Sequence, residues 1–446
     1  MDRAALYGGV HNPWLHVVGK PILMNIPYHR SVLLIVVPLV VLCLPAISDA
    51  ESSCISCHTD LPVDELSQPA QNFTADLHNL AGFGCQDCHG GDPTVGMDDY
   101  ELAHSASKGF IGVPDEQEIP GLCASCHADV EFMKQYDPKL QVDQLLEYRS
   151  SHHGKLLAEG DDKVATCVSC HGVHGIRPID DTRSSVYKTN IARTCAGCHS
   201  DEDYMAEYDI PTKQFAQYKE SIHGRKLMDE GDLAAPTCNN CHGSHGATPP
   251  GLTSVSNACG SCHANNLEYF NQSPHNDAFA MMEIGKCETC HGHHDVEQPT
   301  REEFGIGEDS KCLDCHSEGD AGYTAAKVMA EGYDSLETTL DQARELLERA
   351  ERGGVDVSLG KFDLHSADDA LIKARTAVHY FDTTKYNEVV QAGLIDAQKV
   401  IEQGHEAVDD LEMRRIGLAF TIPVILLVAL ALYLRVRQIE RTKPYA

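Results

Sequence analysis

The stretch Ser150–His174 reads Ser-Ser-His-His-Gly, then a short polar link, then Thr-Cys-Val-Ser-Cys-His-Gly-Val-His. Its centre is the pattern C-x-x-C-H, formed by Cys167, Cys170 and His171. Two cysteines three residues apart lie on one face of a helical turn, and the next residue adds an imidazole beside them. This arrangement of two thiols and one imidazole decides how the rest of the chain is interpreted.

The C-x-x-C-H pattern is the attachment signature of c-type haem. The two sulfurs can reach the two vinyl groups of one porphyrin, and the histidine then lies under the ring, where it can bind the iron. His152, His153 and His174 flank the motif and could bind iron from the opposite side. The stretch therefore predicts a covalent haem site with spare iron ligands.

The motif occurs nine times after residue 50, and it uses all of the 19 cysteines except Cys43. The attachment cysteines are Cys54 and Cys57, Cys85 and Cys88, Cys123 and Cys126, Cys167 and Cys170, Cys195 and Cys198, Cys238 and Cys241, Cys259 and Cys262, Cys287 and Cys290, and Cys312 and Cys315. The histidines that follow them, and that we expect to bind iron, are His58, His89, His127, His171, His199, His242, His263, His291 and His316. Zinc ribbons and redox dithiols also use C-x-x-C, but they do not require this histidine, and a disulfide framework would not give uniform spacing. We expect nine covalently bound haem c groups.

The motifs form a repeat of two haem sites with a period of roughly 70 residues. Each unit begins with C-A-x-C-H-x-D, continues with S-x-H-G and ends with T-C-x-x-C-H-G-x-H, most clearly at 123–174 and 195–245. Sites 54–58 and 85–89 form a divergent first copy, and 312–316 is half of a copy. We predict a mainly α-helical domain with much loop over 51–318, in which the porphyrins themselves form the core.

Six further histidines recur at matching places in the repeats, so we expect them to bind iron opposite the motif histidines. They are His153, His223 and His275 in the S-x-H context, and His174, His245 and His294 after C-H-G. His152 and His293 are neighbours that could replace two of them. Met133 and Met205 could also bind iron, but their repeated aromatic-Met context favours packing against a haem.

Three haems then need an iron ligand from outside this pattern. We assign His78, which lies seven residues before Cys85, and His104, which follows the second motif. For the last haem we assign His379, and His365 and His405 compete with it.

The N-terminal residues 1–50 are expected to be a secretory signal. An apolar run over 31–47 precedes a small-x-small cleavage site at 48–50. Residues before Met24 are an awkward preface to such a signal, so we expect translation to start at Met24. Cys43 would be discarded with this peptide; the alternative is an uncleaved signal anchor.

Residues 319–413 contain no cysteine and are rich in helix formers. Apolar residues follow one another at steps of four and three from Met329 to Ala350 and again from Val390 to Leu411. This pattern is typical of helices packed against helices. We therefore expect a helical hairpin or a three-helix bundle.

Residues 414–436 are expected to form a single transmembrane helix, because 416–434 carry no charge and are just long enough to span a bilayer. Basic residues are more numerous after this segment than before it, which places the tail 437–446 in the cytoplasm. The haem domain would then lie in the periplasm, anchored in the inner membrane. The formal net charge of −32 excludes a nucleic-acid-binding role.

The S-x-H-G and T-C-x-x-C-H-G-x-H units over roughly 51–318 resemble the multihaem c-type cytochromes of anaerobic bacterial respiratory chains. The resemblance implies that electrons pass between a membrane quinol-oxidising complex and periplasmic or outer-membrane cytochromes. The chain departs from the small tetrahaem quinol dehydrogenases, whose membrane helix is N-terminal. This departure argues against direct quinol oxidation.

The alternative is an enzyme, because multihaem oxidoreductases of the hydroxylamine, nitrite or tetrathionate type also combine haem domains with helical C-terminal segments. Such an enzyme needs one haem with an open side. Pentahaem nitrite reductases often mark that haem with C-x-x-C-K, which this sequence lacks. Thirteen other histidines after residue 50 are available for nine irons, which also favours a carrier of electrons without a catalytic residue.

Overall fold

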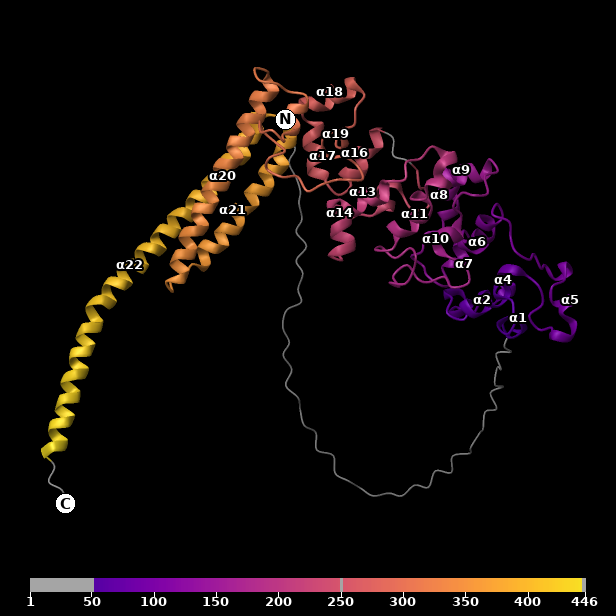
Figure 1. Ribbon diagram of the computed structural model, residues 1–446, viewed down its shortest axis with the longest axis horizontal. Helices are drawn as coiled ribbons and strands as arrows, with labels where there is room; N and C mark the ends of the chain where they lie inside the picture. Colours follow the sequence, from indigo (N-terminus) through magenta and orange to yellow (C-terminus); the bar gives the residue numbers. More distant parts are fainter. Residues whose placement is uncertain (1–51, 249–251, 443–446) are drawn as a thin grey trace, which may run out of the picture. The chain divides into compact units, whose positions relative to one another are not determined.

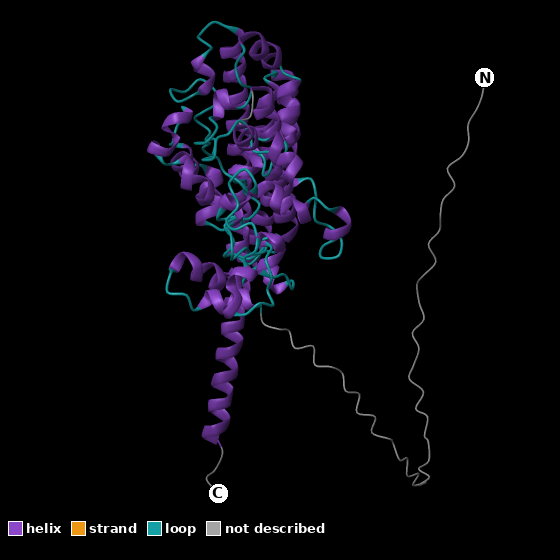
Figure 2. Cartoon of the chain, turned by 90° about the vertical axis from the view of Figure 1, so that its right-hand side faces the viewer, coloured by secondary structure: helices purple, strands orange, loops and turns teal. Residues whose placement is uncertain are grey.

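The computed structural model describes residues 52–248 and 252–442 (Figure 1). The expected signal peptide, with Met24 and Cys43, lies outside the described residues. Helices and loops make up the described part of the chain, and no strand occurs in it (Figure 2). The predicted mainly α-helical, loop-rich fold is confirmed.

Residues 52–318 form short helices that follow one another along the chain. The helices are α1 Ser53–Thr59, α2 Asp64–Phe73, α3 Leu77–Leu80, α4 Cys85–His89, η1 Met97–Asp99, α5 Tyr100–Ala103, η2 Ala106–Lys108, α6 Ile119–His127, α7 Val130–Met133, α8 Gln144–Ser150, α9 His152–Ala158, α10 Cys167–His171, α11 Ile191–His199, α12 Glu202–Met205, η3 Ala206–Tyr208, α13 Gln214–Glu220, α14 Ile222–Gly224, η4 Arg225–Asp229, α15 Cys238–His242, α16 Leu252–Gly260, α17 Ala264–Asn271, α18 Pro274–Met282, α19 Glu288–His291 and η5 Lys311–Asp314. Most are too short to be stable alone, so their positions depend on what they pack against.

The second haem motif of each repeat occupies a helix of about one turn, and its ends are fixed locally. In α10 the backbone N–H of Thr166 donates to Ser169 Oγ at 3.0 Å. The helix stops at Gly172, whose φ of +76° suits glycine. Equivalent glycines, all with positive φ, follow α4, α15 and α19. The turn after the glycine lets the next histidine leave the motif and face another part of the chain.

The S-x-H-G segment forms a tight corner between α8 and α9. Ser151 is fully buried, and its Oγ donates to the Tyr148 carbonyl at 2.6 Å and accepts from the Gly154 N–H at 2.9 Å. A Cβ at Gly154 would lie 2.0 Å from the same carbonyl oxygen, so only glycine fits. The Tyr148 hydroxyl donates to the Ala165 carbonyl at 3.0 Å, next to the following haem motif. These contacts fix the direction of His153.

The same corner recurs in the next repeat between α13 and α14. Ser221 Oγ donates to the Tyr218 carbonyl at 2.6 Å and accepts from Gly224 N–H at 3.0 Å. Tyr218 in turn donates to the Pro236 carbonyl at 2.9 Å. Sequence repetition here therefore reflects one repeated local structure.

The C-terminal part consists of α20 Ala321–Arg352, α21 Ser358–Ala377, the short η6 Val378–Tyr380 and α22 Thr383–Thr442 (Figure 1). Helix α20 follows the N-cap Asp320, which accepts from Tyr323 N–H at 2.7 Å, and Gly353 caps its C-terminal end. The helices α20 and α21 pack against each other and against the first half of α22.

The apolar stripes predicted from the sequence form the core of this bundle. On α20 the buried residues include Met329, Tyr333, Leu336, Leu340, Ala343, Leu347 and Ala350. Along α22 they include Val390, Ala397, Ile401, Val408 and Leu411. Alanines of α21 fill the space between the two stripes.

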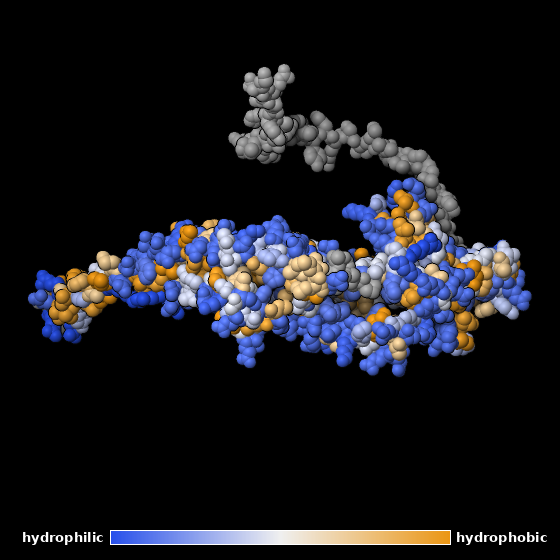
Figure 3. Space-filling model, turned by 90° about the horizontal axis from the view of Figure 1, so that it is seen from above, coloured by the Kyte–Doolittle hydropathy of each residue, from blue (hydrophilic) through white to orange (hydrophobic). Residues whose placement is uncertain are grey.

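Just beyond Leu411, Glu412 still pairs with Arg349 of α20 at 3.5 Å, and Arg414 donates to the Gly354 carbonyl at 3.5 Å. After them α22 continues as an apolar stretch with exposed side chains. Its apolar stretch has a mean hydropathy of 2.5 and none of it is buried, so this helix is long and apolar enough to cross a membrane. Apolar side chains are visible on its surface at the left end of the space-filling view (Figure 3). It is the one helix in the described part of the chain with these properties.

Candidate functional site

The nine C-x-x-C-H motifs are numbered sites 1 to 9 in chain order. Each motif histidine faces a second histidine, with ring centres 5.8 to 6.3 Å apart. In site order the pairs are His58–His104, His89–His174, His127–His78, His171–His245, His199–His153, His242–His294, His263–His223, His291–His379 and His316–His275. Two imidazoles on opposite sides of one metal ion have ring centres roughly 6 Å apart, because each metal–nitrogen bond is about 2 Å. All nine pairs have this separation.

The structure therefore brings every histidine expected to bind iron beside a motif histidine. The histidines that could have replaced them as iron ligands are placed differently. His152, His365 and His405 are exposed, and within the described residues none of them has a ring contact with a motif histidine. His293 is also exposed and touches His294 instead.

The pairs connect each repeat to the next one. The S-x-H histidine serves the first site of the following repeat, as His153 does for site 5 and His223 for site 7. The histidine after C-H-G serves the second site of the preceding repeat, as His174 does for site 2 and His245 for site 4. His379, from η6, takes this role at site 8.

A continuous cavity of about 3920 Å³ joins the nine pairs. All eighteen paired histidines line it, and so do the described motif cysteines apart from Cys198. Divided among nine pairs it gives roughly 440 Å³ each, within the 300–1,000 Å³ that proteins provide for one cofactor-sized ligand. The residues present therefore fit haem, with two thiols and two imidazoles at each position.

The cysteines show which sites are neighbours. The first thiols of sites 1 and 2, 3 and 4, 5 and 6, and 7 and 8 lie within hydrogen-bonding reach of each other. The second cysteines are neighbours at the remaining steps: Cys88 of site 2 lies near Cys126 of site 3, and Cys170 of site 4 lies near Cys198 of site 5. Sites 6 and 7, and sites 8 and 9, are linked in the same way. The nine sites thus follow one another in sequence order without a gap.

The histidines are held in the form that binds metal. Burial lowers the pKa of ten of them, and in His294 the pKa falls to about 4. The others are His127, His153, His171, His174, His199, His223, His275, His291 and His379. Neutral imidazole is the metal ligand, so this shift favours iron binding at neutral pH.

Backbone carbonyls orient several of the rings. His89 Nδ1 lies 2.8 Å from the Gly112 carbonyl, and His379 Nδ1 lies 3.0 Å from the Thr376 carbonyl. A ring that donates from Nδ1 leaves Nε2 free for a metal. The Nε2 atoms of His89 and His174 do face each other, 3.5 Å apart. No sequence signal marks these carbonyls, because any residue can supply one.

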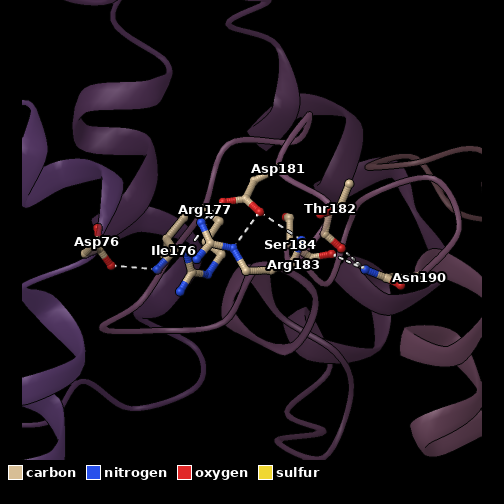
Figure 4. Close-up of polar contacts among 8 residues, drawn as sticks. All are labelled: Asp76, Ile176, Arg177, Asp181, Thr182, Arg183, Ser184 and Asn190. Atoms are coloured by element: carbon tan, nitrogen blue, oxygen red, sulfur yellow. Dashed lines mark hydrogen bonds and ion pairs between the residues drawn. The ribbon is translucent and has the colours of Figure 1, made fainter.

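A polar network holds the loop that joins site 4 to site 5 (Figure 4). Asp181 accepts from Arg183 Nη2 at 2.6 Å and pairs with Arg177 at 3.5 Å. Hydrogen bonds and ion pairing from Arg183 hold the pKa of Asp181 well below its usual range. Asn190 Nδ2 donates to two carbonyls of the same loop, of Thr182 and Ser184.

Comparison with known proteins gives matches in two segments of the chain. A family model described as cytochrome c3 matches residues 77–200, and one described as cytochrome c554 and c-prime matches residues 258–339. The multiheme cytochrome MtrA of Shewanella baltica (strain OS185) is 27% identical over 220 residues, which are 48% of this chain. The chain spans about half the length of that relative, 52%.

No solved structure matches. From the nine motifs, the nine histidine pairs and these matches together, the chain is a multihaem c-type cytochrome with covalently bound haem c.

Proposed function

We propose that the chain is a nonahaem electron relay, with iron held between two histidines at every site. The nine ring pairs 5.8 to 6.3 Å apart carry this proposal. Nine haems bound at these positions would form one uninterrupted series, because each site adjoins the next one in the sequence. The protein supplies spacing, ligands and local charge, and the haems supply one-electron chemistry.

Coordination favours transfer of electrons over catalysis. An iron with two histidine ligands is six-coordinate and has no position for a substrate. Within residues 52–248 and 252–442, every motif histidine has an opposing histidine. A reductase of the hydroxylamine, nitrite or tetrathionate type would need at least one haem without such a partner.

The proposed location is the periplasmic side of the inner membrane, with α22 as the anchor. His379 precedes α22, and the uncharged segment begins at Ile416. This separation is about 50 Å of helix at 1.5 Å per residue. The bundle would therefore act as a stalk that keeps site 8 far from lipid, which argues against direct oxidation of a quinol there.

Protein partners on both sides of the relay follow from this arrangement. We propose a membrane quinol-oxidising complex as one partner and a periplasmic or outer-membrane cytochrome as the other. The net charge of −32 favours partners that present basic patches to this chain. Electrostatic attraction of this kind raises association rates and weakens at high salt.

Two measurements on the purified protein test the proposal. Intact-mass spectrometry should give the mass of the processed chain plus nine haems, and a smaller increase would refute the count. EPR and resonance Raman spectra of the ferric protein should show low-spin iron only. One high-spin, five-coordinate haem in the unmodified protein would favour the reductase instead.

A further inference from the structure

The ligand expected at site 3 has an acidic neighbour that its counterparts lack. His78, His153 and His223 all lie two residues after the residue that caps their helix. That cap is Ser151 or Ser221 in the later repeats, but it is Asp76 in the first. Ser273 stands in the same place before His275. One structural position therefore carries a hydroxyl in three repeats and a carboxyl group in the first.

Asp76 is 1% exposed, and each of its contacts is to an N–H group or a ring nitrogen. Its Oδ1 accepts from the His78 backbone N–H at 2.8 Å and lies 3.0 Å from His78 Nδ1. Its Oδ2 accepts from the Ile176 N–H at 2.7 Å (Figure 4). The carboxyl group thus contacts the Nδ1 side of the imidazole, which leaves Nε2 free for a metal.

The serines at the equivalent position make a different set of contacts. The hydroxyls of Ser151 and Ser221 bond only to backbone groups of their own corner. In the described part of the chain no carboxylate forms an ion pair with His153 or His223. Site 3 therefore differs from sites 5 and 7 by one buried carboxyl group behind the ligand.

Other carboxylates near paired histidines are farther away and more exposed. Asp320 lies 3.4 Å from His316 Nδ1, and Glu147 lies 3.7 Å from His245 Nδ1, with side chains 39% and 46% exposed. Water screens such charges, whereas a buried charge acts more strongly on its neighbour. Asp76 is the strongest candidate of this kind among the described residues.

We propose that Asp76 is a positioning residue that lowers the reduction potential of the haem at site 3. When His78 binds iron through Nε2, its Nδ1–H donates to the Asp76 carboxylate. This hydrogen bond makes the imidazole a stronger electron donor, which stabilises ferric over ferrous iron. The inference rests on the proposed nonahaem relay, and it makes site 3 a low-potential step between sites 2 and 4.

The fold itself provides a conservative substitution for the test. Leu77 N–H donates to the Ile176 carbonyl at 2.8 Å, and Ile222 N–H makes the equivalent bond to Val296 at 2.8 Å, where the cap is a serine. Asp76→Ser therefore installs the residue that the same corner already uses in the later repeats. Asp76→Asn is a second variant, which keeps the size of the side chain but removes the charge.

The experiment is a redox titration of the full holoprotein followed by EPR and visible spectroscopy. In Asp76→Ser and Asp76→Asn, one of the nine haem components should become easier to reduce. At a given potential its ratio of ferrous to ferric iron should rise about tenfold, which corresponds to a potential higher by about 59 mV for one electron. The reverse change, Ser221→Asp, should make one other component harder to reduce. Asp320→Asn, at the exposed carboxylate, is the matched control and should change the ratio by less than twofold.

A titration of Asp76→Ser that superimposes on that of the unmodified protein, with nine low-spin haems retained, would overturn the proposal. So would conversion of one haem to high spin in both Asp76 variants, because Asp76 would then only hold His78 in place. The proposed nonahaem relay is tested separately, by the number of haems and their spin state in the unmodified protein.

Discussion

His153 faces His199 with ring centres 6.1 Å apart, although the two residues belong to different repeats. The same exchange of histidines occurs between every pair of successive repeats. Each repeat therefore places histidines opposite the motif histidines of its neighbours. With haem bound, iron–histidine bonds would tie successive repeats together, which compensates for the small apolar core of residues 52–318.

Exchange of ligands can be tested by counting low-spin haems in double variants. Alanine at His174 should remove one ligand from site 2, whose motif histidine is His89. His174→Ala and His89→Ala should each leave eight low-spin haems, and the double variant should also leave eight, because both changes affect one iron. If His174 served its own motif instead, the double variant would retain only seven by EPR spin quantitation.

The ligand from the C-terminal bundle gives a second test. His379 is held by the Thr376 carbonyl and lies opposite His291, so His379→Ala should convert one haem, at site 8, to high spin. His365→Ala changes an exposed histidine of α21 and serves as the control. Resonance Raman spectra of the two variants decide the matter: a high-spin band in the control, or none in His379→Ala, would contradict the assignment.

The tight corner at Ser151 predicts that adding one methyl group at Gly154 destabilises the protein. A Cβ at position 154 would lie 2.0 Å from the Tyr148 carbonyl oxygen, so Gly154→Ala must displace the backbone that carries His153. We expect a loss of about 1–3 kcal/mol in the free energy of unfolding and one high-spin haem.

The control for this variant is Gly121→Ala on α6, where a Cβ meets nothing within 4 Å. Replacing a helical glycine with alanine in open space stabilises by up to about 1 kcal/mol. Thermal unfolding followed by circular dichroism measures the stability of Gly154→Ala and of Gly121→Ala. Equal melting temperatures for the two variants would show that the corner tolerates a side chain.

Tyr148 gives a prediction that depends on pH. Its hydroxyl donates to the Ala165 carbonyl, so Tyr148→Phe should lose about 1 kcal/mol of stability at neutral pH. Burial raises the pKa of Tyr148 to about 12, against an ordinary value of 10.0. Because folding raises this pKa, the contribution of the Tyr148 hydroxyl to the free energy of unfolding is fully present below pH 10. It is lost as the pH rises through about 12. Denaturant titrations of the unmodified protein and of Tyr148→Phe, from pH 8 to 12, should therefore give free energies of unfolding that converge as the pH rises. Tyr136→Phe, which changes an exposed ring, is the control.

The proposed anchor predicts a soluble form of the chain. A protein that ends at Met413 keeps the buried contacts of Leu411 but loses the apolar part of α22, none of which is buried in the bundle. We expect this form in the soluble fraction with its haem spectrum unchanged, whereas the full chain should need detergent. A truncated protein that remains with the membranes would show that another segment binds them.

Much of the site follows from patterns that are local in the sequence. Cys167, Cys170 and His171 mark a haem site because attachment needs three residues within one helical turn. The stripes of α20 and α22 predicted a bundle because helical periodicity places such residues on one face. Features without a local pattern were not predicted: Asp76 has the role of Ser151 but a different side chain, and the carbonyls of Gly112 and Thr376 carry no residue signature.

The sequence by itself determined the nine C-x-x-C-H motifs, which predict the residues that attach haem, and the histidines that recur around them. Only the tertiary structure decided which histidine faces which motif, as with His174 and His89, which are 85 positions apart. The physical reason is that thioether attachment and the motif histidine depend on neighbours in sequence, whereas the second ligand must come across the haem from another segment. That partner depends on how the corners at residues such as Gly154 and Gly172 direct the chain.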